Sequence, residues 1–225
     1  MSRRSVVIAG LVGVPLCALA VGLYALLRTE SLPAPLAEPV APLLPDLAMS
    51  PLSELSGAVA PDGDRYLLFT ASIGNVGAGP FMVHAVRAEE RGDWRLSQRF
   101  AEPDGSTTET ITPGEMTWAG HGHDHWHVVL GASYWLTRPG SSTILRRYEK
   151  VGYCFFDQTP LLQSVPTAPA VAQFPSTGCD TSSTMELTMG LSPGWTDPYQ
   201  WTLPDQRLLV NELDDGVYRL WATAD

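Results

Sequence analysis

Short runs of apolar residues, separated by turn residues, follow the chain from residue 66 to residue 223. The runs are rich in β-branched and aromatic side chains, and several alternate with polar residues in the two-residue period of a half-buried strand. No stretch after Arg28 has the 3.6-residue period of a long helix. We therefore predict strands over residues 66–73, 81–88, 94–100, 125–136, 143–148, 151–156, 207–213 and 217–223.

This pattern predicts an all-β fold, most simply an antiparallel β-sandwich with long loops. The longest predicted loop runs from Thr159 to Thr184, where prolines fall among Ser, Thr and Ala, too many for a central strand. A long ordered loop of this kind serves either as a functional element or as an inert insertion, and the sequence favours neither.

An uncharged stretch, residues 5–27, precedes the predicted strands and is flanked by Arg3, Arg4 and Arg28. As a helix it would be about 35 Å long, enough to cross a hydrocarbon core of about 30 Å. We expect residues 1–30 to be a transmembrane signal anchor with a cytoplasmic N-terminus or, as the second choice, a cleaved signal peptide. In both cases the rest of the chain is extracytoplasmic, held at the membrane or secreted.

Prolines also mark the segment that follows, residues 31–52, and favour an extended linker over a helix. They are Pro33, Pro35, Pro39, Pro42, Pro45 and Pro51. Residues 53–225 then form the predicted β domain.

Composition narrows the possible partners. Acidic residues number 24 and basic residues 14, giving a net charge of −10, which argues against a protein that binds the phosphate backbone of nucleic acids.

Export places Cys154 and Cys179 in an oxidising compartment, where two cysteines in one domain usually pair. We expect a disulfide between them, the alternative being two buried free thiols.

Four of the five histidines alternate over seven positions: His121, His123, His125 and His127. Neutral imidazole is a common ligand of transition metals, and alternate side chains of a strand share one face. A strand would therefore direct His123, His125 and His127 the same way. Histidine ligands suit Cu or Zn and disfavour Mg or Ca, so Zn stays open on this evidence. The alternative is a histidine-rich surface tract that binds metal adventitiously.

Lys150 is the only lysine among the 14 basic residues. Lysine readily becomes a neutral amine nucleophile and arginine does not, so a single lysine in an arginine-rich chain suggests chemistry at that position. A compositional bias toward arginine explains the same count.

Three segments together resemble the lysyl oxidase family, copper amine oxidases that use a lysine tyrosylquinone. Residues 122–127, Gly-His-Asp-His-Trp-His, resemble the copper-binding His-x-His-x-His segment. Residues 150–157, Lys-Val-Gly-Tyr-Cys-Phe-Phe-Asp, are similar to the segment of the cofactor lysine. Residues 190–201 are similar to the Gly-Leu-Ser-Pro-Gly segment, whose later tyrosine is the cofactor precursor. With residues 44–47 and 67–77, the likeness covers most of residues 44–223 in the family's order.

The resemblance implies a role for each matched residue. His123, His125 and His127 would be the copper ligands, Lys150 and Tyr199 the two halves of the quinone, and His121 has no counterpart. A general base must remove the α-proton of the substrate. The candidates for this base, or for partners that orient the histidines, are Asp157, ranked first for its place in the matched lysine segment, and Asp197 and Asp124.

The implied function is copper-dependent oxidation of primary amines, such as lysyl side chains, peptides or polyamines, by dioxygen. The products are aldehydes, ammonia and hydrogen peroxide. Two other functions stay open: an extracytoplasmic copper-binding β-sandwich without turnover, and a zinc-dependent hydrolase with three histidine ligands.

Overall fold

The structure is a computed structural model that describes residues 41–119, 124–129, 131–150, 152–161, 164–203 and 206–224. The predicted N-terminal anchor, most of the predicted linker, and His121 and His123 lie outside these ranges. Within them, no helix has the length and apolar character needed to cross a membrane.

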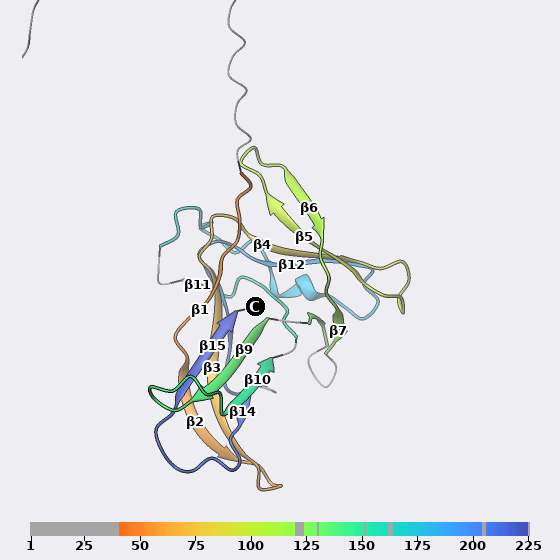
Figure 1. Cartoon of the computed structure of the whole chain (residues 1–225). Coiled ribbons are helices and arrows are strands. Elements are labelled where there is room, and N and C mark those ends of the chain that lie inside the picture. Colours follow the sequence, from red (N-terminus) through yellow and green to blue (C-terminus); the bar gives the residue numbers. More distant parts are fainter. Residues whose placement is uncertain are drawn as a thin grey trace, which may run out of the picture. The chain divides into compact units, whose positions relative to one another are not determined.

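The described residues form an all-β fold of antiparallel sheets, as predicted (Figure 1). The largest sheet has six strands and is built around the long strand β3, which the apolar run from residue 66 to residue 73 predicts. Its order is β1 (Leu47–Met49), β3 (Arg65–Asn75), β13 (Trp195–Tyr199) and β11 (Thr159–Pro160), and β2 (Ser53–Val59) and β14 (Arg207–Leu209) also pair with β3.

Three smaller sheets complete the described fold. A four-stranded sheet has the order β12 (Glu186–Leu191), β4 (Phe81–Val86), β5 (Arg95–Ala101) and β6 (Thr107–Ile111). A three-stranded sheet has the order β10 (Arg146–Lys150), β9 (Ala132–Thr137) and β15 (Arg219–Ala224), and β7 (Met116–Trp118) pairs with β8 (Trp126–Val128). The 3-10 helix η1 spans Ser176–Cys179.

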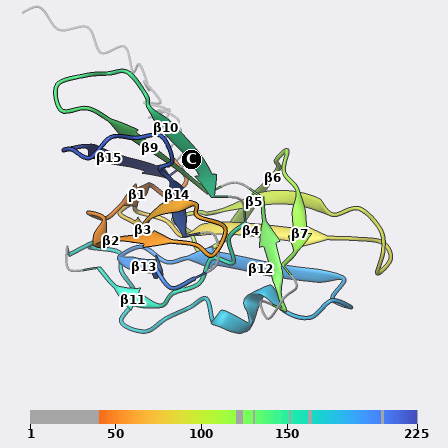
Figure 2. The same cartoon turned by 90° about the horizontal axis from the view of Figure 1, so that it is seen from below.

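The three-stranded sheet packs beside the six-stranded one (Figure 2). Alternation along β9 turns Tyr134 and Leu136 toward the core, where both are buried. The rings of Phe69 on β3 and Tyr134 lie 4.8 Å apart between the two sheets. This apolar contact holds β9 and β10 against β3, and it thereby fixes the end of β10 at which Lys150 lies.

The last residues of the predicted linker belong to the folded domain. Leu43 bridges to Ala101, and β1 pairs with β3. The buried Asn75 side chain accepts hydrogen bonds from the Asp46 and Gly77 backbone and donates to the Gly79 and Leu191 carbonyls. The chain from residue 43 onward is thus tied into the sheets.

Two strand predictions differ from the structure. The run from 125 to 136 is divided between β8 and β9, because β8 pairs with β7 whereas β9 pairs with β10 and β15. Residues 152–156 make only an isolated bridge, between Tyr153 and Val128, and are enclosed at consecutive rather than alternate positions. The predicted loop of residues 159–184 is irregular where described, apart from β11 and η1.

Candidate functional site

A cavity of about 400 Å³ brings together six of the residues singled out in the sequence. We call it the histidine-lysine cavity. Its lining comes from the His125 segment, the end of β10, the segment after Gly152, η1 and β13 with the residues that follow it. The lining residues are His125, His127, Lys150, Cys154, Phe156, Gln158, Ser176, Asp197, Pro198, Tyr199, Gln200 and Leu203.

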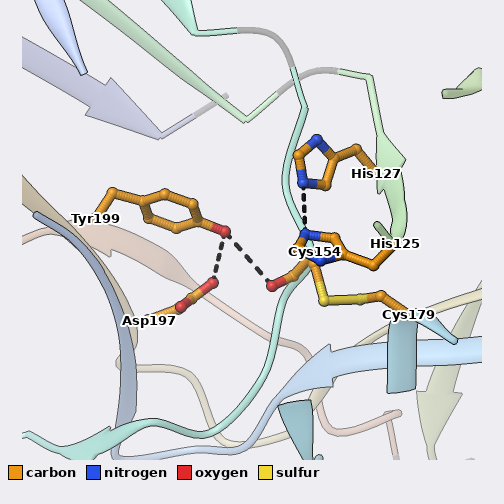
Figure 3. Close-up of a disulfide and its surroundings, with 6 residues drawn as sticks. All are labelled: His125, His127, Cys154, Cys179, Asp197 and Tyr199. Carbon is orange, nitrogen blue, oxygen red and sulfur yellow. Dashed lines mark hydrogen bonds between the residues drawn. A yellow bond between two sulfur atoms is a disulfide. The ribbon is translucent and has the colours of Figure 1, made fainter. Parts of the chain in front are cut away.

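His125 and His127 point toward each other in this cavity (Figure 3). Their Nε2 atoms are 2.8 Å apart, a separation that a hydrogen bond between two imidazoles explains. Two nitrogens bound to one metal at about 2.0 Å and at a right angle are also about 2.8 Å apart, and right-angled ligands are typical of Cu(II). The pair therefore has the donor atoms and the spacing of two adjacent copper ligands.

The third ligand that the sequence predicts, His123, lies outside the described residues, as does His121. Within the ranges that the structure describes, no three His, Cys, Asp or Glu side chains are grouped closely enough to hold a metal ion.

Gly152 explains how His127 comes so close to the lysine segment. Its φ of +101° lies in the region that favours glycine, and a Cβ atom there would be 2.7 Å from His127 Nδ1. The sequence offers a signal for this contact, a glycine two residues after the lone lysine, but only the fold gives it a partner.

Lys150 is the last residue of β10 and is 7% exposed. Its Nζ atom lies 4.9 Å from the ring centre of Tyr199 and 5.2 Å from that of Tyr153. The two tyrosine rings are themselves 4.6 Å apart and nearly perpendicular, so that the amine faces both rings. The lysine and the tyrosine that the resemblance pairs are therefore neighbours in space, although they lie far apart in the sequence.

Asp197 and Tyr199 lie two residues apart on β13 and so share a face of the strand. The Tyr199 hydroxyl donates to Asp197 Oδ2 at 2.8 Å and lies 3.4 Å from the Cys154 carbonyl oxygen (Figure 3). Burial raises the pKa of Asp197 to about 8, against the opposing effects of the Tyr199 hydrogen bond and the Lys150 charge. Burial, with the Asp197 charge, also raises the pKa of Tyr199.

Tyr153 packs against Lys150 and Tyr199 and is fully buried. Its ring stacks on Phe155, and its hydroxyl lies 3.4 Å from the Tyr134 hydroxyl. Burial raises the pKa of Tyr153. Because a Cβ atom at Gly131 would lie 2.1 Å from this ring, residue 131 has to be glycine for Tyr153 to occupy its position.

Cys154 and Cys179 are joined by a disulfide. The bond links the segment that follows Lys150 to η1, so two walls of the histidine-lysine cavity are held together covalently (Figure 3). Both residues are buried.

The structure places Asp157, the first-ranked base candidate, outside the cavity lining. Its carboxylate accepts hydrogen bonds from the Ser192 backbone and hydroxyl, each at 2.7 Å, and from the Gln173 and Phe174 backbone. Asp157 thus joins the residue that follows β12 to the loop of residues 159–184. Asp124 is exposed and is also absent from the lining, whereas Asp197 lines the cavity.

Comparisons with known proteins identify no relative, since no family model, curated protein or solved structure matches the chain.

Proposed function

We propose that this protein is a copper-dependent amine oxidase of the lysyl oxidase type, which forms its cofactor from Lys150 and Tyr199. The observation that carries the proposal is the 4.9 Å distance between the only lysine nitrogen of the chain and the Tyr199 ring, in a cavity that His125 and His127 also line. Composition bias explains a lone lysine, but it does not explain its position beside a tyrosine and two histidines.

His125 and His127 are the described residues that would hold copper, and His123 is the proposed third ligand. Their neutral imidazoles suit a borderline transition metal, and the 2.8 Å spacing of their Nε2 atoms suits two adjacent ligands. Gly152 supports this role, because it allows the lysine segment to pass against His127.

The bound copper and the cross-linked quinone would supply the electrophilic carbonyl and the two-electron acceptor for oxidation of a primary amine by dioxygen to an aldehyde, ammonia and peroxide. The protein's own residues position the reacting groups and accept protons from them. The Tyr153 and Tyr199 rings both contact the Lys150 amine and position it. The disulfide fixes the Cys154 carbonyl against which the Tyr199 hydroxyl rests.

Asp197 is the general base that the geometry favours, in place of Asp157. Oδ2 of Asp197 lies 2.8 Å from the Tyr199 hydroxyl, within proton-transfer distance, and the raised pKa of about 8 suits a group that accepts a proton near neutral pH. The oxygens of Asp157 are already engaged by donors of the surrounding backbone and Ser192.

The cavity lining also suits an alkyl amine. Phe156 and Leu203 offer apolar surface to a carbon chain, and Gln158 and Gln200 offer neutral polar groups. The acidic composition favours cationic amines such as lysyl side chains or polyamines. Nucleic acid is not a proposed partner.

The sandwich arrangement and the cellular location belong to the same proposal. Phe69 and Tyr134 pack between two sheets, as in a sandwich core. The disulfide suits an oxidising, extracytoplasmic compartment, to which a membrane anchor or signal peptide in residues 1–30 would direct the domain.

Peptide mapping by mass spectrometry of the copper-loaded protein tests the proposal. We expect a covalent link between the peptides that contain Lys150 and Tyr199, and peroxide release on addition of a primary amine. Lys150→Arg and Tyr199→Phe provide matched controls without the link. Stoichiometric copper without a link would favour the non-catalytic copper protein, and preferential zinc binding would favour the hydrolase.

A further inference from the structure

Arg87 lies one residue after β4, packs against the ring of Trp126 and is 8% exposed. Its guanidinium carbon is 4.7 Å from the ring centre of Trp94 and 4.8 Å from that of Trp126. The two indoles are 5.0 Å apart at 72°, so the cation sits in the angle between them.

The guanidinium also binds backbone carbonyls on two sides. Nε donates to the Thr184 carbonyl at 2.7 Å, Nη2 to the Ser182 carbonyl at 2.6 Å, and Nη1 to the Glu90 carbonyl. None of the ion pairs found in the described ranges involves Arg87. Arg87 is therefore a buried cation that is held by carbonyl oxygens and ring faces, with no carboxylate partner in those ranges. Its contacts fix the positions of the groups around it and do not neutralise a charge.

Trp126 connects the Arg87 guanidinium to the proposed metal ligands. It lies between His125 and His127 in sequence, and alternation turns its side chain to the opposite side of the strand. Its ring meets Arg87 on a face and Trp118 at an edge, and its Nε1 atom donates to the Thr181 carbonyl at 2.9 Å. Because β8 has only three residues, and its backbone partners in the described ranges are β7 and, through Val128, Tyr153, side-chain contacts contribute to its orientation.

We infer that Arg87 is a positioning residue that fixes the His125–His127 pair through Trp126. The metal role of the pair rests on the proposed function. Arg87 holds the Trp126 ring directly and holds the segment from Thr181 to Thr184 that accepts the indole N–H. The orientation of the segment from His125 to His127 therefore depends on the guanidinium that packs against Trp126.

Lysine at position 87 would keep the charge but not the planar fork that reaches several carbonyls while it lies on two rings. Arg87→Lys should therefore weaken copper binding roughly 10- to 100-fold, the range typical for partners that orient ligands, and should change the Cu(II) electron paramagnetic resonance spectrum. Arg91→Lys is the matched control, because Arg91 is an exposed arginine nearby; it should leave both unchanged.

Trp94→Phe gives a second variant for the case that Arg87→Lys does not fold. Phenylalanine offers a weaker ring to the cation, and the buried Trp94 Nε1 has no hydrogen-bond partner among the described residues, so its removal costs no bond. We expect a smaller loss of copper affinity than for Arg87→Lys. Folded variants at both positions with affinities within about twofold of wild type and unchanged spectra would overturn the inference.

Nitrogen NMR spectra of the imidazoles in the metal-free protein separate this inference from the proposed function. Displaced His125 and His127 signals in Arg87→Lys, with wild-type signals in Arg91→Lys, would support positioning even if the wild-type protein bound no copper. Identical imidazole signals in all three proteins would overturn positioning. Failure of the wild-type protein to bind copper would count against the proposed function alone.

Discussion

Asp157 and Asp197 are both buried carboxylates, and their surroundings give them different properties. Asp157 accepts hydrogen bonds from two segments and acts as a link between them. Asp197 accepts a hydrogen bond from the Tyr199 hydroxyl and lines the cavity, and burial raises its pKa to about 8. A base has to change its protonation state near neutral pH, and the environment of Asp197 favours that change.

Asp197→Asn should abolish amine oxidation and change the pH dependence of stability. Between the unfolded pKa of about 4 and the folded pKa of about 8, the folded protein holds a proton that the unfolded chain releases. The free energy of unfolding therefore falls from pH 4 to pH 8 in wild type, and this contribution disappears in the variant. Urea unfolding of metal-free protein should show the variant gaining at least about 1 kcal/mol relative to wild type between pH 5 and pH 8.

Asp215→Asn is the control for this pH dependence, because the Asp215 side chain is fully exposed. It should follow the wild-type stability curve. Parallel curves for wild type and Asp197→Asn would contradict the assignment of a raised pKa to Asp197.

Lys150→Arg should abolish the cross-link and amine oxidation while copper binding persists. Arginine keeps the charge near the Tyr153 and Tyr199 rings, but its guanidinium stays protonated and does not add to an oxidised ring. No second lysine exists in the chain to replace it. Peroxide release from a primary amine is the measurement, and wild-type turnover by the variant would disprove the role of Lys150.

At the level of secondary-structure elements, the proposed site depends on short segments, and a different kind of contact holds each of them in position. β8 carries His127 and is held by β7, Gly152 lies against His127, and the disulfide connects the lysine segment to η1. None of these contacts follows from the period of the strands, because each joins segments that are separate in the sequence.

His125→Ala should remove most of the bound copper. His125 Nε2 is one of the two converging nitrogens of the histidine-lysine cavity, so its loss leaves His127 without its neighbouring ligand. The metal content of the protein after dialysis against copper checks this expectation. His84→Gln is the control, since His84 lies on β4 and lines no part of that cavity; equal copper in both variants would refute the assignment.

Replacement of both Cys154 and Cys179 by serine should lower the free energy of unfolding by on the order of 3 kcal/mol. The two cysteines are 25 residues apart, and a cross-link of that span restricts the unfolded chain. Urea unfolding with and without a reducing agent gives the test: the reductant should destabilise wild type and leave the double variant unchanged. Equal sensitivity of the two proteins would show that the bond does not form.

At the scale of the whole molecule, the net charge of −10 should act on substrate encounter rather than on chemistry. A cationic diamine should show a KM that rises as salt is raised from about 10 mM to about 300 mM, because screening shortens the range of the attraction. The kcat should change little over the same range. A KM independent of salt would exclude long-range attraction as a contribution to amine binding.

The fold class could be predicted because it depends on local pattern. The apolar run that begins at residue 66 marks β3, and the proline content of residues 159–184 marks the long loop. The division of residues 125–136 into β8 and β9 could not be predicted, because the apolar run does not show that the two halves pair with different strands.

The chemical groups that are present can be identified from the sequence alone: the alternating histidines, one lysine, the later tyrosine and two cysteines. Which of these groups lie close together depends on the fold. It placed Lys150 against Tyr199 across 49 residues, left Asp157 as a link between segments, and buried Asp197 at the cavity. The physical reason is that residue type and spacing fix what a side chain can do. Its neighbours, its burial and hence its pKa depend on segments that only folding brings together.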